Sequence, residues 1–538
     1  MDRLTATLIG AALLAGATAQ AQPRQTNDWP SYNRTLQGDR FAPQTAVTPA
    51  SAARLKPICS YDLGRQTSFQ TGPLEIGGVI YVTTDFDTIA LDAATCAVKW
   101  KTTEAYKAAS PLNVNRGAAI GGARLFRGTQ DGRLLAYDLA TGKRLWAQTL
   151  ADPALGETIP AAPIAWNGMV FVGNAGGDNK GVKGRIYALD AATGKILWEQ
   201  YLVPRQTGDK ARGPAAPPPA MPPGGWGNAP GVPITGGGTW TSYALDPAAG
   251  VLYAPGGNPA PDFAAQLRPG TNPYAGSLVA LDARTGALKT AFPIVERDFH
   301  DWDVSAAPAI VTTRGGVRLA AEAIKNGHVY GLDTASGKQL WSTPTTTILN
   351  ATAPLTATGT RFCPGTQGGS EWNGAAYSPA TNLLYVGAVD WCDTVKLAPP
   401  AQVNAVQPGE PWSGSADAKN VFGKLDPPGH WSGWVNAVDA DSGKVVWKRK
   451  LPAPVLGGVT PTAGGVVFAG DMAGDLYALD ARTGATLWTA KLDGAVGGGI
   501  ISYSTASGEQ RVAIATGMTS PIWPTAKVNA RLVVYGLK

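Results

Sequence analysis

Polar side chains occur at several separated places in the chain that no regular repeat explains. Asp178, Asn258 and Asp303 offer carboxylate and amide oxygens, which are the ligands that a hard cation such as Ca²⁺ prefers. Arg116 and Lys325 are cations that can neutralise a ligand bearing carboxylates. A single Asp or Asn in a loop is most often a turn residue, so no position decides alone. Together the five indicate a site for a metal ion and an anionic ligand.

One aromatic residue belongs with this set. Trp240 follows a glycine-rich stretch, where its indole ring can form a floor for a planar group. The candidate segments fall in well-separated parts of the chain, mostly just before strand-like stretches. They can converge only if the fold returns these stretches to one common axis.

A repeat supplies such a fold. Its unit is Asp-x-x-Thr/Ser-Gly-x-x-x-Trp, in which Asp bonds the turn backbone, Gly provides a positive φ and Trp fills the space between neighbouring sheets. Four of the six intervals between successive copies are 41–52 residues long, close to the period of propeller blades. The variant copy at Asp92 has Cys96 in place of the glycine, and the copy at Asp282 has Thr290 in place of the tryptophan. The seven copies begin at Asp92, Asp138, Asp190, Asp282, Asp333, Asp439 and Asp480.

The sequence therefore predicts an all-β, eight-bladed β-propeller with Trp-containing blade repeats. Two longer intervals hold Pro/Gly-rich insertions, roughly 204–237 and 395–431. The C-terminal strand 531–535 has no following partner, and pairing it with a strand near 55–63 would close an eighth blade and remove open edges. We expect residues 22–538 to form this single domain rather than three domains.

Composition agrees with this interpretation and excludes others. With 67 Gly and 42 Pro among 538 residues, the chain favours many short strands and turns over a helical bundle. The net charge of +6 is spread without a Lys/Arg run, which argues against a nucleic-acid partner.

The N-terminus has the pattern of an export signal. A charged start, an apolar stretch over 4–19 and Ala19-Gln20-Ala21 indicate a signal peptide over 1–21, cleaved near Ala21. The apolar stretch is short for a membrane span, and no second candidate span follows. We therefore expect a periplasmic protein.

Export makes the cysteines candidates for disulfides. Four cysteines allow three connectivities, of which we expect the sequential one, Cys59–Cys96 and Cys363–Cys392. The sequence has no C-x-x-C-H, so no c-type haem site is expected.

Taken together, these motifs resemble those of the pyrroloquinoline quinone (PQQ)-dependent alcohol dehydrogenases. The resemblance covers nearly the whole mature chain. It rests on the Trp-containing repeat and on four motifs in the family's order: Asn115-Arg116-Gly117, Gly257-Asn258-Pro259-Ala260-Pro261, Trp302-Asp303 and Lys325-Asn326-Gly327. The pair Cys363/Cys392 also matches a disulfide of many members.

The resemblance implies a centre on the propeller axis that holds PQQ and Ca²⁺. Asp178, Asn258 and Asp303 would be metal ligands, and Asp303 would also be the catalytic base that takes the alcohol proton while hydride passes to the quinone. Ca²⁺ would act as a Lewis acid. Asp301 is a nearby second carboxylate that we interpret as a turn or supporting residue. The implied cofactor-binding residues are Gln70, Arg116, Gly176, Gly177, Thr239, Trp240, Lys325, Glu371 and Trp372.

Departures from the family pattern refine the expectation. Ser110-Pro111 replace an adjacent-cysteine disulfide, and Gln70 and Glu371 replace a common Glu and Asn. Lanthanide-dependent members carry an extra Asp two residues after the base. Here that position is Ser305, which favours Ca²⁺. The pattern resembles the polyvinyl-alcohol dehydrogenase and lupanine hydroxylase types, which act on bulky, often secondary alcohols.

We therefore predict a periplasmic quinoprotein that oxidises a small-molecule or polymeric alcohol. Without a haem site, it would pass electrons to a separate acceptor such as cytochrome c. The alternative is a non-enzymatic PQQ-like propeller that acts in assembly or scaffolding. A third hypothesis is a quinoprotein remnant that has lost its cofactor.

Overall fold

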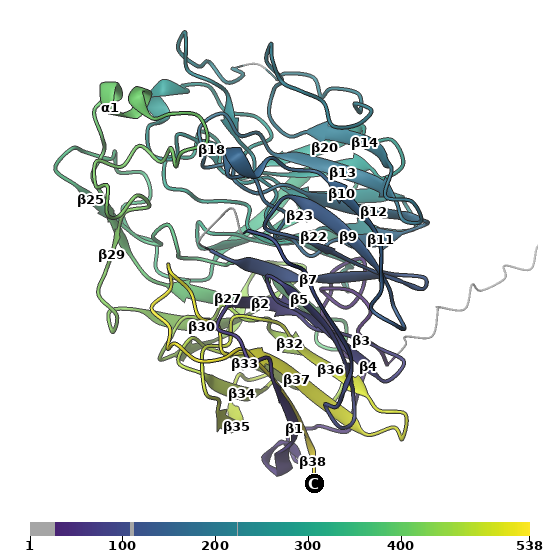
Figure 1. Ribbon diagram of the computed structural model, residues 1–538. Helices are drawn as coiled ribbons and strands as arrows, with labels where there is room; N and C mark the ends of the chain where they lie inside the picture. The colour runs from purple at the N-terminus through teal and green to yellow at the C-terminus, as the bar shows by residue number, and fades with distance from the viewer. Residues whose placement is uncertain (1–26, 108–111, 223) are drawn as a thin grey trace, which may run out of the picture.

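Every copy of the repeat forms the turn between the third and fourth strands of a four-stranded antiparallel unit. The computed structural model describes residues 27–107, 112–222 and 224–538, so the predicted signal peptide and Ser110-Pro111 lie outside the described residues. Figure 1 shows the sheets arranged around the molecule, with few helical segments.

The described residues form eight sheets that contain such a four-stranded unit. This is the number of sheets that the predicted eight blades require. In chain order, the strands of the first four units are β3 (Leu74–Ile76), β4 (Val79–Thr83), β5 (Asp87–Asp92), β6 (Val98–Thr103); β7 (Val114–Gly121), β8 (Arg124–Gly128), β9 (Arg133–Asp138), β10 (Arg144–Thr149); β11 (Ile164–Trp166), β12 (Met169–Gly173), β13 (Arg185–Asp190), β14 (Ile196–Tyr201); and β16 (Ala244–Asp246), β17 (Val251–Pro255), β19 (Ser277–Asp282), β20 (Leu288–Pro293).

The other four units follow the same pattern. Their strands are β21 (Ala309–Thr312), β22 (Arg318–Ala323), β23 (His328–Asp333), β24 (Lys338–Pro344); β26 (Ala375–Ser378), β27 (Leu383–Asp390), β30 (Ser432–Asp439), β31 (Val445–Leu451); β32 (Thr460–Pro461), β33 (Val466–Gly470), β34 (Asp475–Asp480), β35 (Thr486–Lys491); and β36 (Ile500–Ser504), β37 (Gln510–Thr516), β38 (Arg531–Leu537), β1 (Leu55–Asp62).

Shorter elements decorate these sheets. β2 (Ser68–Gly72) runs parallel to β7, β15 (Thr235–Gly236) pairs with β18 (Pro259–Ala260), and β28 (Asp393–Val395) pairs with both β25 (Thr360–Phe362) and β29 (Lys424–Leu425). The helical segments are α1 (Pro400–Ala405) and 3₁₀ turns at Ala52–Arg54, Pro153–Leu155 and Ala265–Leu267. Among the described residues, none of the helices has the length and apolar character needed to cross a bilayer.

The closing strand pair is confirmed. β1 pairs antiparallel with β38, from Leu55 opposite Leu537 to Asp62 opposite Arg531, and the two strands lie side by side near the C-terminus in Figure 1. The last four-stranded unit thus takes its fourth strand from the N-terminal part of the chain. β1 covers the edge of β38 that would otherwise be unpaired.

The repeat residues also join each sheet to the next. Asp190 Oδ1 accepts hydrogen bonds from Thr193 N at 2.8 Å and Thr193 Oγ1 at 2.7 Å, which fixes the turn, and Gly194 has φ 76°. A Cβ on Gly194 would lie 2.7 Å from the ring of Trp146 in the preceding sheet. Trp146 Nε1 donates to Ala191 O at 3.3 Å. Gly194 therefore has two roles: it adopts the positive φ of the turn, and it leaves room for the indole ring of Trp146.

The two predicted disulfides, Cys59–Cys96 and Cys363–Cys392, are present. Cys96 takes the place of the repeat glycine in the left-handed region, with φ 60°.

A buried carboxyl group in β3 leads to a stability prediction. Burial raises the pKa of Glu75 from 4.5 to about 7. Between these values the folded protein binds a proton that the unfolded chain has released, so the free energy of unfolding falls as pH rises. Glu75→Gln is expected to remove this loss and to be more stable than the parent above pH 7, by up to about 3 kcal/mol. Urea denaturation of both proteins below pH 4.5 and above pH 7 measures the free energy of unfolding. The same pH dependence in both proteins would contradict the prediction.

Candidate active site

The alternation of strand direction explains why the predicted site residues can meet. In these antiparallel units, the loop between the second and third strands and the connection to the next unit lie at one end. Asp178, Asn258 and Lys325 lie in loops of the first kind, and Trp240 and Asp303 lie in connections of the second kind. The Asp–Gly turns of the repeat lie at the opposite end. Antiparallel geometry therefore separates the scaffold turns from the candidate site.

Asp303 is held by donors from three directions. Its Oδ1 accepts hydrogen bonds from Trp240 Nε1 and from the backbone N of Asn258, each at 3.1 Å. Its Oδ2 accepts from Lys325 Nζ at 2.8 Å. A Cβ on Gly257 would lie 2.7 Å from Oδ1, so only glycine leaves the carboxylate its place. The carboxylate is thus buried and oriented in advance.

Lys325 joins two carboxylates. Its Nζ also lies 3.1 Å from Asp301 Oδ2. Burial lowers the pKa of Lys325, but the charges of Asp301 and Asp303 outweigh it, and the resulting pKa lies well above the usual value. Lys325 therefore stays an ammonium ion. Asp301, interpreted from the sequence as a supporting residue, contacts this site directly.

Arg116, near the start of β7, lies between two indole rings. Its guanidinium carbon is 4.6 Å from the ring centroid of Trp240 and 5.2 Å from that of Trp372. Its Nη1 donates to Trp240 O at 2.8 Å. Its Nε and the Oε1 of Gln70 are buried, and neither has a hydrogen-bond partner among the described residues. Such unsatisfied polar atoms fit a polar ligand that binds here.

Glu371 adds a titratable group to the site. Burial raises its pKa to about 7, although the charges of Lys325 and Arg116 offset part of the rise.

The other predicted cofactor residues bring backbone segments together. Thr239 is fully buried, and its hydroxyl accepts a hydrogen bond from Tyr243 at 2.8 Å.

Gly176 and Gly177 allow close backbone approach. Gly176 has φ 101°, and a Cβ on Gly177 would lie 2.9 Å from Gly238 N. The loop after β12 therefore lies directly against the glycine-rich segment before Trp240. Contact of these glycines and of Thr239 with a cofactor stays a prediction.

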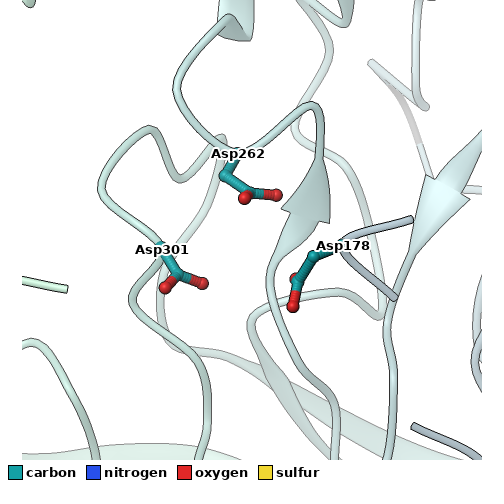
Figure 2. Close-up of side chains that lie close together, drawn as sticks. All are labelled: Asp178, Asp262 and Asp301. Carbon is teal, nitrogen blue, oxygen red and sulfur yellow. The ribbon is translucent and has the colours of Figure 1, made fainter. Parts of the chain in front are cut away.

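Three carboxylates converge beside Asp303. One ligand oxygen from each of Asp178, Asp262 and Asp301 lies within 4.8 Å of the others. Figure 2 shows these side chains reaching toward a shared space from three separate loops. Burial and the charge of Asp303 raise the pKa of Asp178 to about 6, and burial with neighbouring carboxylates raises the pKa of Asp262 and Asp301 well above the usual value. A cation in this space would relieve that cost, so the donor set fits a hard metal ion.

Asp262 is the residue that sequence reasoning missed. The motif ends at Pro261, and one Asp after a proline looks like a turn residue. Of the predicted metal ligands, Asp178 belongs to the cluster and Asn258 contacts it, since Asn258 Nδ2 donates to Asp262 Oδ1 at 3.0 Å. Asp303 lies next to it, through Lys325. The predicted ligand set of Asp178, Asn258 and Asp303 stays a prediction.

A buried arginine positions both carboxylate loops. Arg268 is 0% exposed, and its Nη2 donates to Asp262 O at 2.9 Å and to Asp298 O at 2.5 Å. Asp298 Oδ2 in turn accepts from Trp302 N at 3.0 Å. Arg268 therefore fixes the loop of Asp262 against the loop that carries Asp301 and Asp303.

Comparisons with known proteins agree with this geometry. A profile described as the β-propeller domain of glucose/ethanol/alcohol dehydrogenases matches residues 29–357, more than half of the chain. The quinohemoprotein alcohol dehydrogenase ADH IIB of Pseudomonas putida is 31% identical, over 98% of this chain and 80% of its own length. The chain belongs to the PQQ-dependent alcohol dehydrogenase family.

Solved structures agree with the family assignment. A europium-containing methanol dehydrogenase superposes with a TM-score of 0.83 at 27% identity, covering 95% of this chain and 98% of that one. A profile of the outer membrane assembly factor BamB matches only residues 432–525, and BamB of Moraxella catarrhalis, at 16% identity and a TM-score of 0.50, shares the fold alone.

The chain is a PQQ-dependent alcohol dehydrogenase, and its family implies PQQ and a metal ion. The unsatisfied atoms of Gln70 and Arg116 and the three carboxylates fit these groups.

Proposed function

We propose that this family member oxidises a bulky or secondary alcohol in the periplasm, with Ca²⁺ as a sufficient metal ion and a separate cytochrome c as electron acceptor. The observation that carries the catalytic part is the Asp303 carboxylate, held by Trp240, Asn258 and Lys325 beside the carboxylate cluster. Gln70, Arg116, Trp240 and Trp372 would hold PQQ, and Asp178 and Asn258 would hold the metal ion.

Asp303 is the base in this proposal. Its Oδ2 accepts one hydrogen bond, from Lys325, and keeps a lone pair for the proton of a substrate hydroxyl. The donors on Oδ1 keep the carboxylate from rotating away. The bound cofactor supplies the electron acceptor for the alcohol carbon, and the metal ion supplies Lewis-acid polarisation.

We base the bulky substrate on a cluster of buried indole rings that includes Trp372, which contacts Arg116. The ring of Trp523 lies 6.4 Å from that of Trp372 and 5.9 Å from that of Trp391. Trp523 Nε1 is buried without a hydrogen-bond partner among the described residues, so it is available to a substrate oxygen. Large apolar rings favour a substrate with more carbon surface than methanol offers.

The other parts of the proposal rest on the sequence and the disulfides. The pattern at 1–21 and the two disulfides support an oxidising, exported location. Ser305, in place of an extra acidic residue, supports Ca²⁺, and the lack of C-x-x-C-H in the sequence supports an external haem acceptor.

Reconstitution tests the function. The purified protein with PQQ and Ca²⁺ is expected to reduce an artificial dye with secondary alcohols, at a higher kcat/KM than with methanol. Samples without PQQ, or with PQQ and a chelator, are the controls. Absence of both PQQ binding and dye reduction across the alcohol panel would overturn the proposal and favour the assembly or remnant alternatives.

A further inference from the structure

Asp262 is a buried carboxylate with an unsatisfied oxygen. The residue is 0% exposed. Its Oδ1 accepts from Asn258 Nδ2, but its Oδ2 has no hydrogen-bond partner among the described residues. Figure 2 shows the carboxylate directed toward the space that it shares with Asp178 and Asp301. A buried acceptor without a partner carries a desolvation cost, which a ligand in that space would remove.

The charges around this space do not balance. Asp178, Asp262, Asp301 and Asp303 contribute four carboxyl groups, whereas Lys325 is the ammonium that contacts two of them. The nearby guanidinium of Arg268 makes its hydrogen bonds to the backbone oxygens of Pro261, Asp262 and Asp298 and to the side chain of Asn272. A cation of high charge would therefore balance the excess of carboxyl groups in this space.

The structure supplies an acidic group that the sequence pattern lacks. The sequence pattern favours Ca²⁺ because Ser305 stands where lanthanide-dependent members carry an extra Asp. Ser305 is fully buried and donates to Ser370 O at 2.6 Å, so its hydroxyl is committed elsewhere. Asp262 reaches the cluster from a different loop, directly after the Asn258 motif. Its carboxylate therefore adds the negative charge that Ser305 does not.

We propose that Asp262 is a direct ligand of the metal ion, with Asp178 and Asp301, and that it makes the site bind a trivalent lanthanide more tightly than Ca²⁺. Both ions take hard oxygen ligands, but attraction to a carboxylate grows with the charge of the ion. Asn258 would turn its amide so that the oxygen faces the ion. The inference rests on the proposed function only in placing this ion beside PQQ.

Metal binding tests the assignment without relying on turnover. Protein loaded with PQQ and stripped of metal is titrated with Tb³⁺, followed by luminescence excited through tryptophan, and Ca²⁺ and La³⁺ are then used as competitors. The parent is expected to bind Tb³⁺ at least about tenfold more tightly than Ca²⁺. Asp262→Asn is expected to weaken Tb³⁺ binding by at least about tenfold and Ca²⁺ binding by less.

The matched control is Glu322→Gln in β22. Glu322 is also fully buried, and neither carboxyl oxygen has a partner among the described residues, but it lies outside the cluster. Its loss is expected to leave Tb³⁺ affinity unchanged. Asp262→Asn with parental Tb³⁺ affinity, or a parent that prefers Ca²⁺, would overturn the inference. Should such a parent still reduce dye with PQQ and Ca²⁺, the proposed function stands and only the role of Asp262 fails. The competition of Ca²⁺ with Tb³⁺ for the parent protein needs no variant. It therefore decides between the two ions even if Asp262→Asn does not fold.

Discussion

Replacing Asp303 with asparagine is expected to lower kcat by about 100- to 10,000-fold, the range that a positioned general base contributes. Asparagine keeps the shape of the side chain and an oxygen that can accept from Trp240 Nε1 and Asn258 N, which now bind Oδ1. It removes the basic carboxylate that faces Lys325. The proton acceptor is lost while the surrounding loops keep their contacts. Steady-state dye reduction in the reconstituted protein, with the PQQ spectrum as a measure of loading, gives the result.

The control separates catalysis from the cost of removing a buried charge. Glu322→Gln also removes a fully buried carboxyl group, from β22, and is expected to keep the parental kcat. If Asp303→Asn retains kcat within about threefold of the parent at equal PQQ loading, a base that contributes 100-fold or more is excluded, and proton transfer must use another group.

The scaffold could be predicted from the sequence because its signals are local and repeated. The turn Asp and Gly lie four residues apart, so each copy carries its own structural explanation. The pairing of β1 with β38 also follows from sequence, since a last strand without a partner needs an edge to cover. Both disulfides join cysteines that are neighbours in sequence order.

The site could be predicted only in part, because its contacts join loops that are distant along the chain. Arg116, Trp240 and Asp303 stood out as residues that the repeat does not need, and the structure brings them together. Asp262 did not stand out. Its role depends on the distance to Asp178 and Asp301, which the packing of separate sheets and the buried side chain of Arg268 determine. No spacing along the chain encodes that distance.

Replacing Trp198 with alanine is expected to lower the free energy of unfolding by about 3–5 kcal/mol, the usual cost of truncating a large buried aromatic residue. Trp198 is 3% exposed, its ring lies 6.0 Å from that of Phe171, and its Nε1 donates to Ala283 O of the next sheet at 3.2 Å. A Cβ on Gly286 would lie 2.7 Å from the ring, so the indole fits against this glycine. The loss would therefore open a cavity between two sheets. Urea denaturation of the cofactor-free protein, followed by circular dichroism, measures it.

The neighbouring residue tests whether burial between sheets is the cause. Leu197 precedes Trp198 in β14 but is 39% exposed, because successive side chains of a strand point to opposite faces. Leu197→Ala is expected to change the free energy of unfolding by no more than about 0.5 kcal/mol. A loss below about 1 kcal/mol for Trp198→Ala, or equal losses for the two variants, would show that the Gly–Trp contact does not hold the sheets together. The Asp–Gly turn alone would then account for the repeat, and the presence of tryptophan in it would need an explanation other than packing between sheets.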